Sequence, residues 1–153
     1  MPVPGVIRRL AGVDYSAQRT FFVTLCVKDR MGVFRDRRLA ELAQREILER
    51  RNDGWYWLLS YCIMPDHVHL LLRLKTPRRG LSRVVTALKN AIYYGAARIG
   101  LSVDWQLGYH DHVLRQFESV STFARYILEN PIRKSMVREY TDYQFCGVVD
   151  SWM

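Results

Sequence analysis

The chain has 153 residues, a hydrophobic fraction of 49% and a formal net charge of +8, which predicts one packed domain over residues 1–153. No apolar run reaches the ~18 residues of a membrane span, and the N-terminus has no apolar stretch of signal-peptide length, so we expect a cytoplasmic protein. The three cysteines include no C-x-x-C pair, and an odd number argues against a disulfide framework. The positive surplus, carried mostly by arginine, points to nucleic acid as the partner.

The first half of the chain predicts three strands and one helix. Residues 1–14 are expected to form a flexible leader. Residues 19–28 are β-branched, aromatic and apolar, which is typical of a strand. Apolar residues then recur at helical spacing over 39–51. Residues 55–64 and 67–74 predict two more strands, and the short Pro65–Asp66 break between them favours an antiparallel hairpin.

The second half predicts a helix over 81–99, a strand over 109–115 and a helix over 118–130. Asn130-Pro131 closes that helix and opens a short fourth one, since proline is tolerated at a first helical position. The tail, 140–153, shows no clear period. This order predicts an α+β fold of the ferredoxin-like, split βαβ type: an antiparallel four-stranded sheet with helices on one face, plus C-terminal helices. That fold hosts many functions and decides none.

The first histidine pair is His67-Val68-His69, inside the third predicted strand. Residues two apart on a strand point to the same face, so the two imidazoles lie side by side. Two neutral imidazoles supply half of a metal site. The alternative is a pair of buried histidines that only hydrogen-bond to their neighbours. Asp66 is placed to orient one imidazole through its carboxylate.

Tyr126 and Asn130 lie one turn apart on the predicted helix 118–130, at the margin of its buried stripe. From that margin both side chains can face the histidines. Each has a simpler alternative. Tyr126 can be a packing residue, and Asn130 before Pro131 can be the N-cap of the next helix.

Four segments, in this order, resemble one family. They are Met64-Pro-Asp-His-Val-His-Leu-Leu71, Trp105-Gln106, Tyr109-His-Asp-His-Val-Leu-Arg115 and Arg125-Tyr-Ile-Leu-Glu-Asn-Pro-Ile-Arg133. The succession resembles the REP-associated tyrosine transposases, within the single-strand transposases whose HUH motif is His, a hydrophobic residue, His. The resemblance covers roughly residues 15–140. The paired motifs are specific in this order, and any one alone is weak.

The resemblance implies that His67 and His69 bind a metal ion, that Asn130 is the third ligand and that Tyr126 is the nucleophile. A mixed nitrogen and oxygen shell suits Mg²⁺ or Mn²⁺, and ligand type alone also permits zinc. The second pair, His110-Asp-His112, departs from the pattern by having a histidine at 110. We assign His112 to the family's position and His110 to a variable DNA-contacting or surface residue.

The resemblance further implies single-stranded DNA carrying a hairpin as the partner. The candidate DNA-binding residues are Arg78, Arg79, Arg83, His112, Arg115, Arg133 and Lys134. For the basic residues among them, the alternative is an ordinary solvated surface charge.

The favoured function is therefore a metal-dependent tyrosine transposase, associated with the nucleoid, that nicks and rejoins single-stranded DNA through a covalent 5′-phosphotyrosine. One alternative is a non-catalytic ferredoxin-like domain that binds single-stranded nucleic acid on its sheet. Another is a replication or conjugation nickase, although such enzymes usually have longer chains. The sequence leaves open whether the protein acts as a monomer or as a homodimer.

Overall fold

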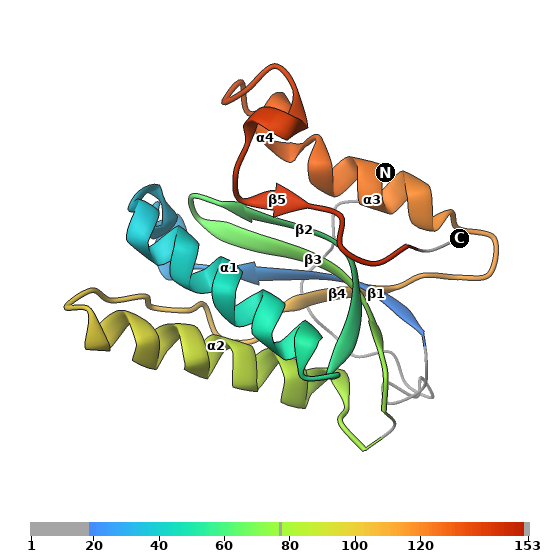
Figure 1. Ribbon diagram of the computed structural model, residues 1–153, viewed down its shortest axis with the longest axis horizontal. Coiled ribbons are helices and arrows are strands. Elements are labelled where there is room, and N and C mark those ends of the chain that lie inside the picture. The colour runs from blue at the N-terminus through green and yellow to red at the C-terminus, as the bar shows by residue number, and fades with distance from the viewer. Residues whose placement is uncertain (1–18, 77, 152–153) are drawn as a thin grey trace.

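The computed structural model describes residues 19–76 and 78–151; the predicted leader, 1–14, lies outside them. Figure 1 shows a mixed α/β fold around one antiparallel sheet, which confirms the predicted fold class. The principal elements are β1 (Thr20–Cys26), α1 (Arg37–Asn52), β2 (Tyr56–Met64), β3 (His67–Leu74), α2 (Leu81–Arg98), β4 (His110–Val113), α3 (Val120–Leu128), α4 (Asn130–Arg133) and β5 (Cys146–Gly147).

The strand order is β4-β1-β3-β2-β5, and every pairing is antiparallel. β3 is therefore the central strand, and its first residue, His67, lies opposite Cys26 of β1 and Met64 of β2. The predicted four strands are present, and the C-terminal tail adds β5 against β2 as a fifth (Figure 1). The Asp150 carboxylate anchors this tail, because it accepts a hydrogen bond from the Leu58 amide and pairs with Arg51.

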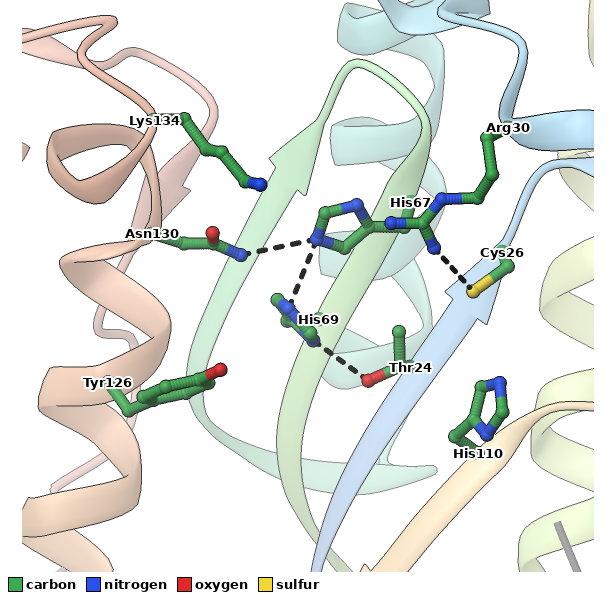
Figure 2. A pocket seen from close by; sticks show the side chains of 9 residues that line it. All are labelled: Thr24, Cys26, Arg30, His67, His69, His110, Tyr126, Asn130 and Lys134. Carbon is green, nitrogen blue, oxygen red and sulfur yellow. Dashed lines mark hydrogen bonds between the residues drawn. The ribbon is translucent and has the colours of Figure 1, made fainter. Parts of the chain in front are cut away.

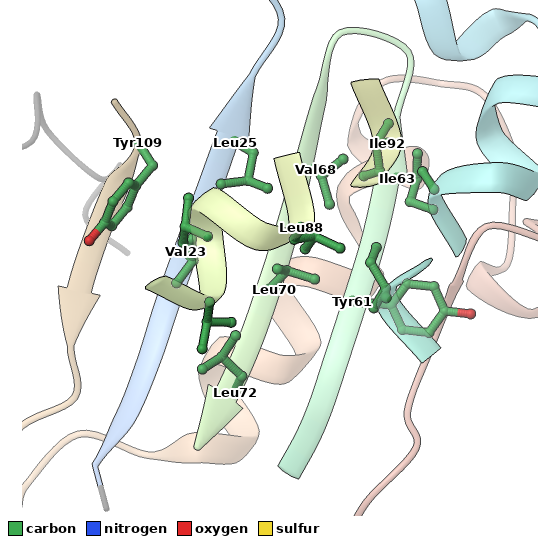
Figure 3. Close-up of a cluster of buried hydrophobic side chains, with 14 of the residues drawn as sticks. Val23, Leu25, Tyr61, Ile63, Val68, Leu70, Leu72, Leu88, Ile92 and Tyr109 are labelled. Atoms are coloured by element: carbon green, nitrogen blue, oxygen red, sulfur yellow. The ribbon is translucent and has the colours of Figure 1, made fainter. Parts of the chain in front are cut away.

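Strand alternation divides the sheet into two different faces. One face is apolar: Val68, Leu70 and Leu72 of β3 lie in a large buried cluster with side chains of α1 and α2 (Figure 3). His67 and His69 point to the opposite face, toward α3 (Figure 2). The two histidines therefore lie on the face of the sheet opposite the main hydrophobic core.

The two long helices cover the apolar face, as their buried stripes predict. They pack closely at Gly95 of α2, where an added Cβ would lie 2.9 Å from a methyl group of Leu42 in α1. α3 and α4 lie on the other side of the sheet from α1 and α2 (Figure 1). Within the described ranges, no helix is long and apolar enough to cross a membrane.

α3 is held on its face by a second, smaller apolar cluster. Phe123, Ala124 and Ile127 of α3 are buried there against Phe22 and Leu71 of the sheet. Ser119 caps the helix, its side chain accepting a hydrogen bond from the Thr122 amide. This small core fixes the position of α3 on the sheet, and with it the position of Asn130 at the start of α4 relative to the histidines.

Candidate active site

The two histidines of β3 converge on one point. The Nε2 atoms of His67 and His69 lie 3.1 Å apart, and their ring centroids are separated by 4.5 Å. Both residues are almost fully buried, with 6% and 7% of their surfaces exposed. The same-face arrangement expected from the spacing of the pair is thus present.

The far nitrogen of each ring has its own partner. Asp66 Oδ1 lies 2.6 Å from His67 Nδ1, and Thr24 Oγ1 lies 2.9 Å from His69 Nδ1 (Figure 2 shows the Thr24 contact). The Asp66 carboxylate accepts from His67 Nδ1 and so fixes the Nδ1–H tautomer of His67; the Thr24 hydroxyl supports the same tautomer of His69 when it accepts from Nδ1. With both rings in that tautomer, the two Nε2 lone pairs face the space between the rings.

Burial keeps these imidazoles neutral. It lowers the pKa of His67, although the Asp66 carboxylate opposes this, and it lowers the pKa of His69 well below its usual value. Burial alone would raise the Asp66 pKa, but the hydrogen bond from His67 and the charge of Arg30 outweigh it and lower that pKa. The pair is therefore unprotonated, as metal coordination requires.

Asn130 lies against His67. It is 95% buried at the start of α4, and its amide nitrogen lies 3.2 Å from His67 Nε2. The N-cap of α4 is Glu129, and no side chain caps that helix. The amide of Asn130 thus points at the histidines rather than at the helix end.

Tyr126 lies one turn before Asn130, and its hydroxyl points toward the histidines (Figure 2). Its ring lies 6.4 Å from the His69 ring and 6.0 Å from the Phe22 ring, measured between centroids. The guanidinium of Arg133 lies over the other side of the Tyr126 ring, at 4.0 Å, and donates to the Tyr126 carbonyl at 2.6 Å. The Tyr126 ring is therefore held between Phe22 and Arg133, and its hydroxyl points into the cavity.

These side chains line a cavity of about 270 Å³. Both histidines line it, and strands β1, β3 and β4 and helices α3 and α4 contribute to it. Its lining residues are Thr24, Cys26, Arg30, His67, His69, His110, Tyr126, Asn130 and Lys134.

The donor set fits a divalent cation. In the Nδ1–H tautomer of both rings, the two Nε2 lone pairs face each other across 3.1 Å and a cation between them removes their repulsion. No group of three His, Cys, Asp or Glu side chains surrounds this point in the described part of the chain. The third ligand would be the Asn130 amide, whose oxygen reaches the same point once the amide turns over.

The two residues of the second histidine pair lie in different surroundings. His110, which we assigned to a variable surface or DNA-contacting position, lines the cavity. His112 instead hydrogen-bonds to the Glu118 carboxylate, at 2.9 and 3.0 Å, and stacks on Phe123 with ring centroids 5.4 Å apart. Its Nε2 already has a partner within the chain.

The candidate DNA-binding residues fall into two groups. Lys134 and Arg133 lie beside the cavity, the latter engaged with Tyr126. Four arginines lie toward the other end of the sheet, because they follow the far ends of β3 and β4, and an eight-residue strand spans roughly 25 Å. These are Arg78, Arg79, Arg83 and Arg115; Arg79 stacks over Trp55 at 4.0 Å.

Sequence analysis missed three residues that line the cavity: Thr24, Cys26 and Arg30. Thr24 and Cys26 carry a detectable signal, because they alternate on one face of β1 directly opposite His69 and His67. Arg30 has no such pattern. It reaches the site through an irregular turn whose course the local sequence does not predict.

Comparison with known families identifies the same region of the chain. The family model described as "Transposase IS200 like" matches residues 16–130, which is most of the chain. A search among curated proteins finds no match.

Two solved structures resemble the fold. One is a REP-associated tyrosine transposase bound to a REP hairpin, with a TM-score of 0.74 and 20% sequence identity; the alignment covers 93% of this chain and 81% of that one. The other is a protein from Deinococcus radiodurans R1 described as a candidate transposase. Its TM-score is 0.50 at 20% identity, over 85% of this chain and 98% of that one.

Proposed function

Because the chain belongs to the IS200-like transposase family, we propose that it is a metal-dependent tyrosine transposase that nicks and rejoins single-stranded DNA. The proposed site uses Tyr126 as the nucleophile and His67, His69 and Asn130 as ligands of Mg²⁺ or Mn²⁺. Asp66 orients His67. The protein would act at the nucleoid.

One observation carries this proposal. The Nε2 atoms of His67 and His69 lie 3.1 Å apart, the Asn130 amide lies 3.2 Å from His67 Nε2, and a tyrosine hydroxyl is directed into the same cavity. A neutral, buried pair of imidazoles is the protonation state that coordination of a divalent cation needs. The phenol, held against Phe22 and Arg133, is positioned for attack on a phosphate held beside it.

The chain's own groups supply the steps. A divalent ion, when bound, polarises the scissile phosphate as a Lewis acid. The Tyr126 oxygen attacks phosphorus, the bond to the 3′-oxygen breaks, and the proton of the phenol passes to that 3′-oxygen. The product is a 5′-phosphotyrosine and a free 3′-hydroxyl. The covalent bond retains the energy needed for rejoining, so no nucleotide cofactor is required.

The proposed substrate is a DNA hairpin with a single-stranded flank. The net charge of +8 favours phosphate binding, and the similar structure in the comparison was solved with a REP hairpin. A flexible strand bends into a small cavity, whereas bending duplex DNA strongly costs on the order of ~1–6 kcal/mol.

The decisive experiment combines a labelled hairpin oligonucleotide with a single-stranded flank, the protein and Mn²⁺, followed by a denaturing gel. We expect a protein–DNA adduct from the wild type and none from Tyr126→Phe, which still binds DNA. Tyr94→Phe, an exposed tyrosine on α2, is the matched control and retains the adduct. Loss of nicking in both variants, or full nicking by Tyr126→Phe, would contradict the assignment.

The substrate is tested separately. One sequence is offered as a hairpin with a flank, as the same strand with a scrambled stem, and as a full duplex. We expect the first to be cut fastest. A non-catalytic binding domain predicts no adduct with any of them, and faster cutting of the duplex would indicate a double-strand nuclease.

A further inference from the structure

A second cavity, of about 420 Å³, adjoins the candidate active site. Arg30, His67 and Lys134 line both cavities. Among the described residues, His69 and Tyr126 line the first and not the second. The second cavity therefore opens on the His67 side of the histidine pair, away from the tyrosine.

The second cavity has the charge of an anion-binding site. Three cations line it, Arg30, Arg35 and Lys134, with one carboxylate, that of Asp66. That carboxylate is already engaged on both oxygens: Oδ1 with the His67 ring and Oδ2 with Arg30 Nε, at 3.0 Å. The cationic surplus is available to a ligand with negative charge, such as a DNA phosphate.

The backbone conformation at Asp29 and Arg30 directs the Arg30 side chain toward the second cavity. Asp29 and Arg30 have φ angles of 55° and 54°, a left-handed conformation that residues other than glycine rarely adopt. Such strain concentrates at binding and catalytic sites. The result is a guanidinium that lies beside His67, with Nη1 donating to Cys26 Sγ at 3.3 Å (Figure 2). Sulfur is a weak acceptor, which a phosphate oxygen readily replaces.

The direction of the proposed reaction indicates which part of the DNA enters. In phosphoryl transfer the attacking and leaving oxygens lie roughly in line, on opposite sides of phosphorus. Tyr126 lies on the His69 side, and Arg30 lies on the opposite side of the pair (Figure 2). For a scissile phosphate held beside the histidine pair, the 3′-oxygen would leave toward the second cavity.

We propose that this second cavity binds the strand that ends in the new 3′-hydroxyl, with Arg30 holding the phosphate one nucleotide upstream of the cut. The inference rests on the proposed function and extends it. Rejoining reverses the cleavage: the 3′-oxygen attacks phosphorus, its bond to Tyr126 breaks, and the proton returns to the phenol. A cavity that retains the 3′-hydroxyl strand raises its local concentration for that step.

The test measures binding of a short fluorescent oligonucleotide that ends in the 3′-hydroxyl, by anisotropy and without cleavage. We expect Arg30→Ala to weaken its binding about tenfold, as for loss of a hydrogen-bonded charge pair. Arg45→Ala, which removes an exposed arginine of α1, is the control and should change binding less than twofold. Equal losses in both variants would show that only overall charge matters, and would overturn the proposal.

Neutral methylphosphonates locate the contact. With the upstream phosphate neutralised, Arg30→Ala should cause no further loss. With a phosphate elsewhere in the same oligonucleotide neutralised, the tenfold loss should persist. The opposite pattern would assign Arg30 to another phosphate and reject the proposal. Should Arg30→Ala melt at a lower temperature than the wild type, Arg30→Lys replaces it and should show part of the loss, because it keeps the charge without the planar fork.

The rejoining step is measured on preformed adduct. When the 3′-hydroxyl oligonucleotide is supplied below saturation, Arg30→Ala adduct should rejoin about tenfold more slowly than wild-type adduct. Adduct formation itself tests the proposed function independently. An adduct that forms normally, with binding and rejoining that do not depend on Arg30, would reject this inference alone; absence of any adduct in the wild type would reject the proposed function.

Discussion

The two histidine pairs have identical spacing and different surroundings. His67 and His69 lie on the central strand β3, almost fully buried, with Nε2 atoms 3.1 Å apart. His110 and His112 lie on the edge strand β4 and are only partly buried. His112 is engaged with Glu118, while His110 lines the cavity from the other side of β1.

The difference shows what spacing alone determines. The H-x-H pattern places two rings on one face of a strand, and both pairs obey it. Their neighbours decide the rest. Thr24 and Asp66 hold the Nδ1 atoms of the central pair and direct both Nε2 atoms at one point. On the edge strand, Glu118 occupies Nε2 of His112, so the second pair presents no common point for a metal.

The largest effect should come from the central pair itself. His67→Ala or His69→Ala should lower cleavage by about a thousandfold or more, because a metal ion supplies several kcal/mol of transition-state stabilisation. Calorimetric titration with Mn²⁺ should show binding lost in the double variant. His110→Ala is the matched control for the comparison, and its Mn²⁺ affinity should match the wild type. Unchanged Mn²⁺ binding after loss of both central histidines would remove the metal assignment.

A tenfold to hundredfold effect is expected for the residue that orients the central pair. Asp66→Asn retains the shape but weakens the hydrogen bond to His67, and such changes typically cost about 10–100-fold in metal affinity. Excess Mn²⁺ should therefore restore cleavage in this variant. Failure of rescue at saturating Mn²⁺ would assign Asp66 another role, such as holding Arg30.

Local patterns were sufficient for the main elements of the fold. The predicted strand 67–74 has the bounds of β3, and the predicted helix 81–99 ends within one residue of α2. Strong periodicity in long elements carries that information. β5 escaped prediction because it is two residues long and depends on β2 and on Asp150, which are distant in sequence.

Some features of the candidate site could likewise be predicted from the sequence, and others could not. The histidine face and the position of Tyr126 and Asn130 on one flank of α3 and α4 follow from helix and strand periods. The orientation of Asn130 toward His67 does not, because the same residue before proline is equally suited to cap a helix. Arg30 depends on two consecutive left-handed residues; aspartate tolerates that conformation, but Arg30 itself provides no sequence signal for it.

A smaller effect, on stability rather than on metal binding, is expected for the edge pair. His112→Ala removes the stacking on Phe123 and the bond to Glu118, so the free energy of unfolding should fall by about 1–2 kcal/mol. Urea denaturation measures this loss. Mn²⁺ affinity measured on the folded variant should equal that of the wild type. A hundredfold loss of Mn²⁺ affinity would instead place His112 with the central pair.

The smallest effect is the pH dependence that Glu118 gives to the edge pair. Desolvation alone would raise the Glu118 pKa, but hydrogen bonds from the Arg115 amide and the His112 ring outweigh it and lower that pKa in the folded protein. A carboxyl whose pKa is lower when folded stabilises the protein above its unfolded pKa of about 4.3, and this contribution disappears as the pH falls through the folded pKa. Glu118→Gln should therefore cost about 1 kcal/mol at pH 7 and progressively less below pH ~4. Urea denaturation of both proteins at several pH values measures the difference. A difference that is constant across that range would mean that the charge of Glu118 contributes nothing to its interaction with His112, and that hydrogen bonding and the stacking on Phe123 hold the edge pair apart from the central one.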